Sequence, residues 1–140
     1  MSILEPAHSP WPQRMLSVLR IVAALVFISF GTMKLFNHPP MPAGLPPVQP
    51  MSQLWLAGLL ETIGGPLMLI GLFTRPVAFI LSGEMAVAYF QGHFPHNFWP
   101  SINMGTPAIL YCFIYLYLVF AGAGAWSVDA MIARSRAGGT

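Results

Sequence analysis

The sequence predicts an all-α integral membrane protein, an antiparallel bundle of four transmembrane helices that forms a single domain over residues 1–140. Of the 140 residues, 56% are hydrophobic and only 7% are charged, whereas soluble domains carry about 25% charged residues. Four long apolar stretches and a one-sided distribution of arginine point the same way. So few polar side chains cannot cover a surface in water, and we therefore expect lipid to cover most of it.

The four apolar stretches are each close to the roughly 20 residues that a helix needs to cross hydrocarbon. They cover about residues 15–36, 53–73, 76–91 and 107–125, and the third is the shortest. A Pro-rich loop (38–50), a tight turn at Thr74-Arg75-Pro76 and an aromatic loop (92–103) connect them. Pro76 and Pro107 suit the first turn of a helix, where the missing amide proton costs nothing.

The basic residues set the orientation. With the N-terminus inside, the cytoplasmic side holds Arg14, Arg75, Arg134 and Arg136, while the two external loops hold no Lys or Arg. This is the positive-inside pattern, and it predicts a multi-pass membrane protein with both termini in the cytoplasm. The net charge of +2 is then a topology signal, and we expect no nucleic acid partner.

The first apolar stretch also resembles a signal peptide, because Arg14 precedes it. The stretch is longer than a signal core, however, and it closes on Lys34 and a Pro-rich loop where a cleavage site of small residues belongs, so we expect it to remain. The single cysteine, Cys112, excludes an internal disulfide or a dithiol pair.

Several ionisable residues lie within the apolar stretches and must avoid lipid, where each costs about 2.5–3.5 kcal/mol at mid-membrane. On the first helix, spacings of three and four predict one inward stripe, formed by Ser17, Arg20, Ala24, Phe27, Gly31, Lys34 and His38. Small residues surround Glu61 one turn away, namely Ala57, Gly58, Gly64 and Gly65. Small residues permit a close neighbouring helix, so Glu61 is expected to point inward, although the same residues could serve dimerisation.

Two carboxylates are expected at one depth. Glu61 and Glu84 each lie about seven or eight residues from the outer ends of their helices, about 11 Å below the outer boundary. The same count in the fourth helix reaches Tyr111 and Cys112, with Tyr115 a turn deeper. Lys34 lies about one turn below the boundary and can lean inward. We predict a site with Glu61, Glu84 and Lys34 as its catalytic groups.

Two neighbouring carboxylates in a low dielectric cannot both stay charged without a cation, so Lys34 pairs with one of them or a proton is shared. Such a group could exchange protons with a quinone or relay them for a carried solute. The structural alternative is that Lys34 and Glu61 only fix helix register, with Glu84 protonated and hydrogen-bonded to Tyr111 or Tyr115.

Two further sets of residues receive structural interpretations. Arg20 and Asp129 are expected to form a structural ion pair that ties the segment after the fourth helix to the bundle. His93 and His96 could suggest a metal or haem site, but Pro95 breaks the helix between them and no third ligand lies nearby. We therefore predict no metal site.

The chain resembles the DoxX family of small four-helix bacterial membrane proteins. The resemblance spans about residues 15–130 and rests on four segments: Gly31-Thr-Met-Lys34-Leu-Phe36, Glu61-Thr-Ile-Gly64-Gly65, Gly71-Leu-Phe-Thr-Arg75 and Gly122-Ala-Gly124-Ala-Trp-Ser127-Val-Asp129. Many similar relatives read Asn-Gly-Gly-Glu before the fourth helix, where this chain has Asn103-Met-Gly105-Thr106. Thr106 thus places a hydroxyl group at the outer mouth of the bundle, where these relatives have a carboxyl group.

The resemblance implies that the chain lies in the bacterial inner membrane and acts in a redox setting. The family takes its name from a subunit of a thiosulfate:quinone oxidoreductase, and other members resemble a membrane component that assembles with superoxide dismutase and a thiol-handling enzyme. We therefore expect an accessory subunit of a quinone-linked membrane oxidoreductase complex, with the redox centre on a partner subunit and quinone as the candidate cofactor. Residues expected to contribute to binding are Tyr111, Tyr115, Asn103 and His38.

Two alternatives remain open. The same carboxylates could serve a carrier or channel for a small solute, or the chain could be an anchor or assembly factor without chemistry of its own, which recruits a partner through its outer loops. A homo-oligomer is compatible with all three functions. The substrate and the partner do not follow from the sequence.

Overall fold

The computed structural model describes residues 9–139, and in this range the chain is all-helical and contains no strand. The elements are α1 (Trp11–Phe36), α2 (Gln53–Ile70), α3 (Thr74–Ala88), a short π-helix η1 (Tyr89–His93), α4 (Thr106–Ala121) and α5 (Val128–Ala137). The prediction of an all-α chain is therefore confirmed. The short helix α5 was not predicted.

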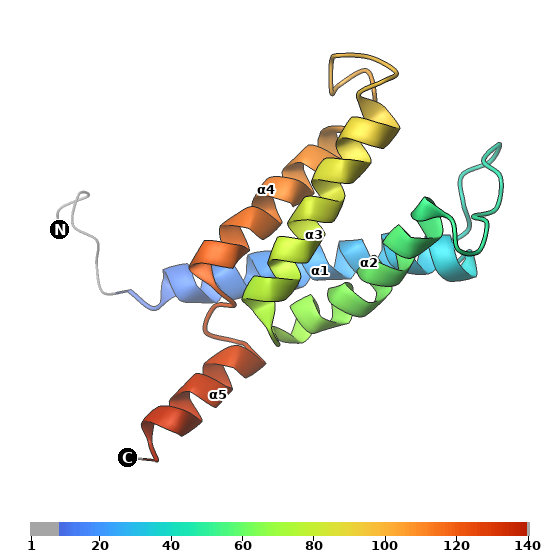
Figure 1. Ribbon diagram of the computed structural model, residues 1–140. Coiled ribbons are helices and arrows are strands. Elements are labelled where there is room, and N and C mark those ends of the chain that lie inside the picture. Colours follow the sequence, from blue (N-terminus) through green and yellow to red (C-terminus); the bar gives the residue numbers. More distant parts are fainter. Residues whose placement is uncertain (1–8, 140) are drawn as a thin grey trace.

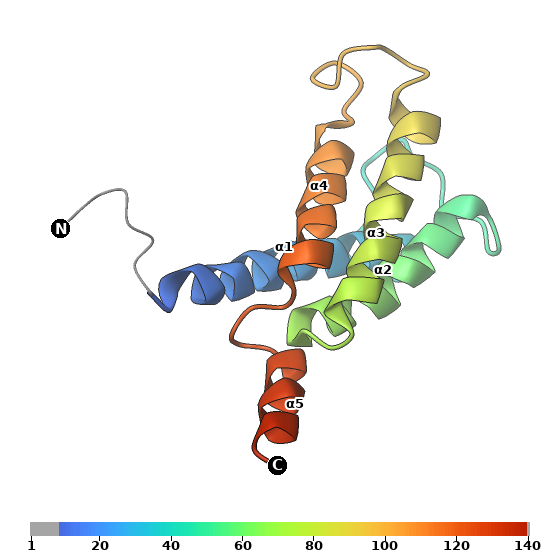
Figure 2. The same cartoon turned by 60° about the vertical axis from the view of Figure 1, so that its left-hand side comes forward.

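The long helices form two antiparallel hairpins. In Figure 1, α2 runs back along α1, and α4 runs back along α3. Figure 2 shows that the two hairpins cross, so that α1 passes behind the lower part of the α3–α4 pair. This crossed arrangement differs from the alignment of four parallel axes that a simple bundle implies. The predicted antiparallel four-helix bundle thus stays a prediction.

Two of the described helices, α1 and α2, are long and apolar enough to cross a membrane, and α4 is a shorter apolar helix. The helix ends differ from the predicted ones at two glycine-containing turns. The tight turn lies at residues 71–73 and not at 74–76, because Gly71 (φ 69°) ends α2 in the left-handed region that glycine favours. The fourth helix ends at Ala121 and not near residue 125, since Gly122 (φ 85°) redirects the chain.

Glycines allow α1 and α2 to pack closely. A Cβ atom added to Gly31 would lie 2.7 Å from the backbone nitrogen of Thr62, and one added to Gly65 would lie 2.5 Å from Cγ1 of Ile28. Gly58 meets Lys34 across the same interface. Because van der Waals packing dominates helix association in lipid, such close approach stabilises the hairpin. The small residues of α2 therefore serve internal packing.

The predicted inward stripe of α1 is confirmed along the helix. Its buried members are Ser17, Arg20, Ala24, Phe27 and Gly31, and Lys34 is half-buried. His38 was placed wrongly, since α1 ends at Phe36 and His38 is exposed in the following loop.

The guanidinium of Arg20 joins three segments of the chain. It donates to the carbonyl oxygens of Met68 and Leu69 at 2.5 Å, of Ala123 at 2.8 Å and of Trp126 at 2.6 Å. The predicted Arg20–Asp129 ion pair is therefore wrong, since the described residues form no salt bridge between them. Carbonyls at the end of α2 and in the loop between α4 and α5 take up the donors of this buried guanidinium instead.

Asp129 ties α5 to the start of α3. Its two carboxylate oxygens accept hydrogen bonds from the backbone amides of Phe73 and Thr74, both at 2.9 Å. The carboxylate thus caps a helix N-terminus, where the amides are otherwise unpaired and the helix dipole favours an anion. The segment after the fourth helix is tied back as predicted, although through other partners.

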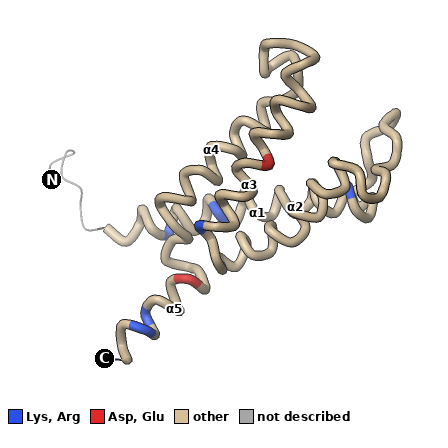
Figure 3. Tube along the Cα trace, viewed as in Figure 1, with Lys and Arg blue, Asp and Glu red and all other residues tan. Residues whose placement is uncertain are grey.

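The arginines gather at one end of the molecule. Figure 3 shows basic segments where α1 and α3 begin and along α5. Arg75 donates to the carbonyl oxygens of Val119 and Phe120 at 2.8 Å and so caps the end of α4. The opposite end carries the Pro-rich loop and the aromatic loop.

Candidate functional site

A cavity of about 590 Å³ lies where the two hairpins cross, and α1, α2, α3, η1 and α4 all contribute to its lining. Most of the lining is apolar, with Phe27 and Phe30 from α1 and Met85 from α3 among its residues. Three ionisable side chains also line the cavity, those of Lys34, Glu61 and Glu84. A largely apolar cavity with a few convergent polar groups is typical of a binding site for a small molecule.

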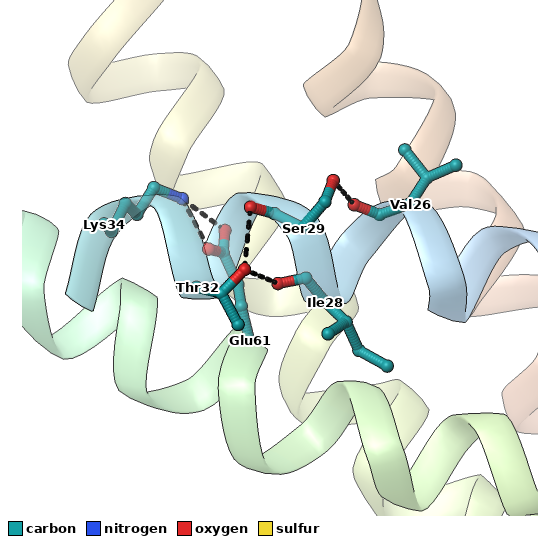
Figure 4. A network of polar contacts seen from close by, with 6 residues as sticks. All are labelled: Val26, Ile28, Ser29, Thr32, Lys34 and Glu61. Atoms are coloured by element: carbon teal, nitrogen blue, oxygen red, sulfur yellow. Dashed lines mark hydrogen bonds and ion pairs between the residues drawn. The ribbon is translucent and has the colours of Figure 1, made fainter. Parts of the chain in front are cut away.

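Lys34 and Glu61 form an ion pair across the α1–α2 interface. The Nζ atom of Lys34 lies 2.5 Å from one carboxylate oxygen of Glu61 and 2.6 Å from the other. The side chain of Glu61 is 1% exposed and that of Lys34 is 15% exposed. Figure 4 shows the two side chains pointing toward one another. In so buried a place the pair neutralises its own charge, since a lone ion would be very costly.

The hydroxyl groups of α1 near this pair are occupied within their own helix. Thr32 donates to the carbonyl oxygen of Ile28 at 3.1 Å, and Ser29 donates to that of Val26 at 2.5 Å (Figure 4). Back-bonding of this kind satisfies a hydroxyl where water is scarce. Neither hydroxyl hydrogen-bonds the carboxylate of Glu61.

Glu84 brings the second carboxyl group to the cavity from α3. Both of its oxygens are buried, and neither has a hydrogen-bond partner among residues 9–139. Glu61 and Glu84 are near enough to interact electrostatically. The hydrogen bond from Glu84 to Tyr111 or Tyr115, which the structural alternative requires, is not formed. A buried carboxyl group without a hydrogen bond lowers the stability of the fold by about 1–3 kcal/mol or more. A hydrogen-bonding ligand from outside the described residues would remove this penalty.

The two tyrosines of α4 differ in their access to the cavity. Tyr111 lines it and packs against Phe27 at 5.5 Å and Phe30 at 6.5 Å between ring centroids. Tyr115 is fully buried beside Tyr111, at 5.9 Å and stacked, and its hydroxyl has no partner within the part of the chain described. Tyr111 can therefore contact a ligand, while Tyr115 supports it from behind.

The other two predicted binding residues lie outside the cavity. His38 is exposed in the Pro-rich loop. Asn103 is buried within the aromatic loop, where its side chain accepts from the amide of Gly105 at 2.7 Å and donates to the carbonyl of Asn97 at 2.8 Å. Its role is to shape the loop.

The sequence interpretation missed several lining residues. Gln53 opens α2 and Gln91 lies in η1, and their side chains hydrogen-bond each other at the cavity. His93 also lines the cavity, and its Nδ1 lies 3.0 Å from the carbonyl oxygen of Asn103. The two glutamines, which stand at the outer ends of consecutive apolar stretches, were the available signal. Nowhere in residues 9–139 do three or more His, Cys, Asp or Glu side chains group as metal ligands.

Comparison with known proteins identifies the family. The DoxX family model matches residues 15–94. An uncharacterized protein of Haemophilus influenzae is 44% identical over 117 residues, which is 81% of this chain and 87% of the relative. No solved structure matches the chain. The segment that the family model matches contains most of α1, all of α2 and α3, and the ion pair of the cavity. The chain is a member of the membrane-associated DoxX family.

Proposed function

We propose that this chain is an accessory subunit of a quinone-linked oxidoreductase complex of the bacterial inner membrane, with both termini in the cytoplasm. It binds the quinone in the cavity between the hairpins and handles its protons, while a partner subunit holds the redox centre. The positive end formed by α5 and the starts of α1 and α3 supports this orientation.

One observation carries the proposal. The carboxyl group of Glu84 is buried at the cavity without a hydrogen-bond partner among the described residues, next to the neutralised pair of Lys34 and Glu61. A ring that carries carbonyl or hydroxyl oxygens would satisfy this carboxyl and fit between apolar walls. Tyr111 offers an aromatic face for such a ring.

The chemistry assigned to the chain is proton transfer. Reduction of a quinone to a quinol consumes two electrons and two protons. The partner subunit supplies the electrons. Glu84 gives the first proton to a ring oxygen within hydrogen-bond reach and takes up a new proton from water on the outer side. It then gives the second proton, and a further proton from water restores its carboxyl group. Lys34 balances the charge of the neighbouring Glu61 throughout. Oxidation of a quinol reverses each step.

The test is the quinone content of the purified protein. We expect quinone to co-purify with the wild-type protein from native membranes in polymer nanodiscs, and to be strongly reduced in Glu84→Leu and in the double variant Lys34→Met/Glu61→Gln. Tyr117→Phe is the matched control, because Tyr117 is exposed and lies outside the cavity. Extraction followed by mass spectrometry measures the quinone per protein. An equal content in all four proteins would overturn the proposal.

The alternatives make different predictions for the same proteins. A small-solute carrier or channel would give solute flux in proteoliposomes that depends on Glu84, without bound quinone. A pure anchor would tolerate replacement of both carboxylates and would lose complex formation when residues 38–50 are deleted. The first outcome would identify a carrier or channel, and the second would identify an anchor.

A further inference from the structure

We infer that the cavity opens sideways to the bilayer between α2 and α3, and that its ligand is an amphiphile with a small polar ring and an apolar tail that stays in the lipid. This inference rests on the proposed function and specifies how the ligand reaches the site. It excludes access from the aqueous phase as the main route.

The first support is the arrangement of α2 and α3. Both views show these helices as a V that is closed by the turn between them and widens toward the outer loops. The hairpins α1–α2 and α3–α4 each pack along their length, whereas α2 and α3 diverge away from the turn that joins them. The cavity occupies this region, since side chains from both arms of the V line it.

The second support is the gradient of exposure across the cavity. Lining residues on the arms of the V are exposed apolar side chains, with Leu60 of α2 at 42% and Ile80 of α3 at 53%. The most buried lining residues lie on the far side, with Phe27 of α1 at 1% and Ala108 of α4 at 6%. The cavity therefore runs from an apolar mouth at the lipid-facing surface to a closed floor on α1 and α4.

The third support is the polar bridge at the wide end of the V. Gln53, the first residue of α2, hydrogen-bonds Gln91 of η1 across the gap. His93, two residues on, is held by the aromatic loop through the carbonyl oxygen of Asn103. These contacts span the cavity on its outer side, between the site and the loops.

The chemistry of the site then defines the ligand. A lipid-soluble molecule that enters between Leu60 and Ile80 meets the unpaired carboxyl of Glu84 and the ring of Tyr111. Its leading end must carry oxygen atoms that can exchange hydrogen bonds with a carboxyl group, and its trailing end must be apolar, because the mouth offers only hydrocarbon.

The experiment measures the rates of binding and release of radiolabelled decyl-benzoquinone with the protein in lipid nanodiscs. Leu60→Trp and Ile80→Trp narrow the mouth. Ile63→Trp and Phe79→Trp are matched controls on the same two helices, exposed but outside the cavity lining. We expect both mouth variants to slow binding and release by about tenfold or more, because a bulky side chain at the entrance obstructs passage in both directions. The equilibrium affinity for the probe should change little. The controls should stay within about twofold of wild type.

The same benzoquinone without its tail separates the two routes. We expect the tail-less benzoquinone to bind wild-type protein much more slowly than the tailed probe at equal total concentration, because little of it partitions into the bilayer. If wild type binds the tailed probe but the mouth variants match their controls, or if the tail-less probe binds as fast as the tailed one, the sideways route is wrong and the proposed function survives. If wild type binds neither probe, the proposed function and this inference both fall.

Discussion

Nζ of Lys34 lies within 2.6 Å of both carboxylate oxygens of Glu61, across an interface in which Gly58 meets the Cβ of Lys34. The ion pair and the close helix packing are thus parts of one arrangement. A larger residue at position 58 would push Lys34 away from its partner. The charge at the cavity therefore depends on the fit between α1 and α2.

The first prediction concerns this ion pair. Lys34→Met or Glu61→Gln alone leaves one buried charge without its partner, and each should lower the free energy of unfolding by about 3–5 kcal/mol. The double variant removes both charges and should recover much of the loss. Thermal unfolding followed by size-exclusion chromatography in detergent measures this, with Arg134→Met as an exposed control. A double variant that loses the sum of the two single losses would show that the pair does not exist.

The second prediction tests the packing of α1 on α2. Gly31→Ala places a Cβ atom 2.7 Å from the backbone nitrogen of Thr62 and should cost about 1–3 kcal/mol, because two backbones must separate. Gly83→Ala is the matched control in α3, where an added Cβ meets nothing within 4 Å. It should be neutral or stabilise the protein by up to about 1 kcal/mol, since alanine favours helix. Equal unfolding temperatures for the two variants would contradict the packing.

The third prediction concerns the carboxylate that ties α5 to α3. Asp129→Ala leaves the amides of Phe73 and Thr74 without their acceptor and should cost about 1–2 kcal/mol, as for loss of a helix cap. Hydrogen exchange should accelerate in the first turn of α3, and proteolysis should increase at residues 122–127. Arg134→Ala changes α5 without touching the cap and should do neither. Unchanged exchange in α3 would mean that Asp129 does not cap it.

Physical reasons separate what the sequence predicts from what it does not. The glycines around Glu61 and the stripe from Ser17 to Lys34 follow from helical periodicity, so burial and the approach of α1 to α2 are predictable. Glu84 and Tyr111 follow from the number of residues between each of them and the outer end of its helix, which places residues of different spans at a similar depth.

The partners of individual polar groups were harder to predict. Arg20 was assigned to Asp129 because opposite charges at one depth attract, yet four carbonyl oxygens, two at the end of α2 and two in the loop after α4, accept from the guanidinium. Such carbonyls are invisible to sequence reasoning until the helix ends are known. The helix α5 was missed although Ser127 is a capping residue and Arg134 and Arg136 lie in the last turn. The predicted fourth helix extended past Gly122 to about residue 125, so the start of α5 at Val128 was not recognised.

The fourth prediction addresses orientation in the membrane. In a Cys112→Ala background, Ser101→Cys marks the aromatic loop and Ser135→Cys marks α5, and both positions are exposed. With α5 in the cytoplasm, a membrane-impermeant maleimide should label Ser101→Cys in intact spheroplasts and Ser135→Cys only after lysis. The reverse labelling would overturn the proposed topology. A functional Cys112→Ala protein is the control, since the thiol of Cys112 makes a single polar contact among the described residues, 3.6 Å from the hydroxyl of Ser82.

The most direct test of proton handling in the cavity is redox-induced infrared difference spectroscopy on the protein with bound decyl-benzoquinone. Electrochemical reduction of the quinone should produce a carboxyl carbonyl band that shifts in heavy water, is absent in Glu84→Gln and persists in Tyr117→Phe. This result is expected because the carboxyl of Glu84 faces the cavity without another partner among the described residues. A spectrum without any carboxyl band, or a band that survives in Glu84→Gln, would contradict the role of Glu84 in exchanging protons with the ligand.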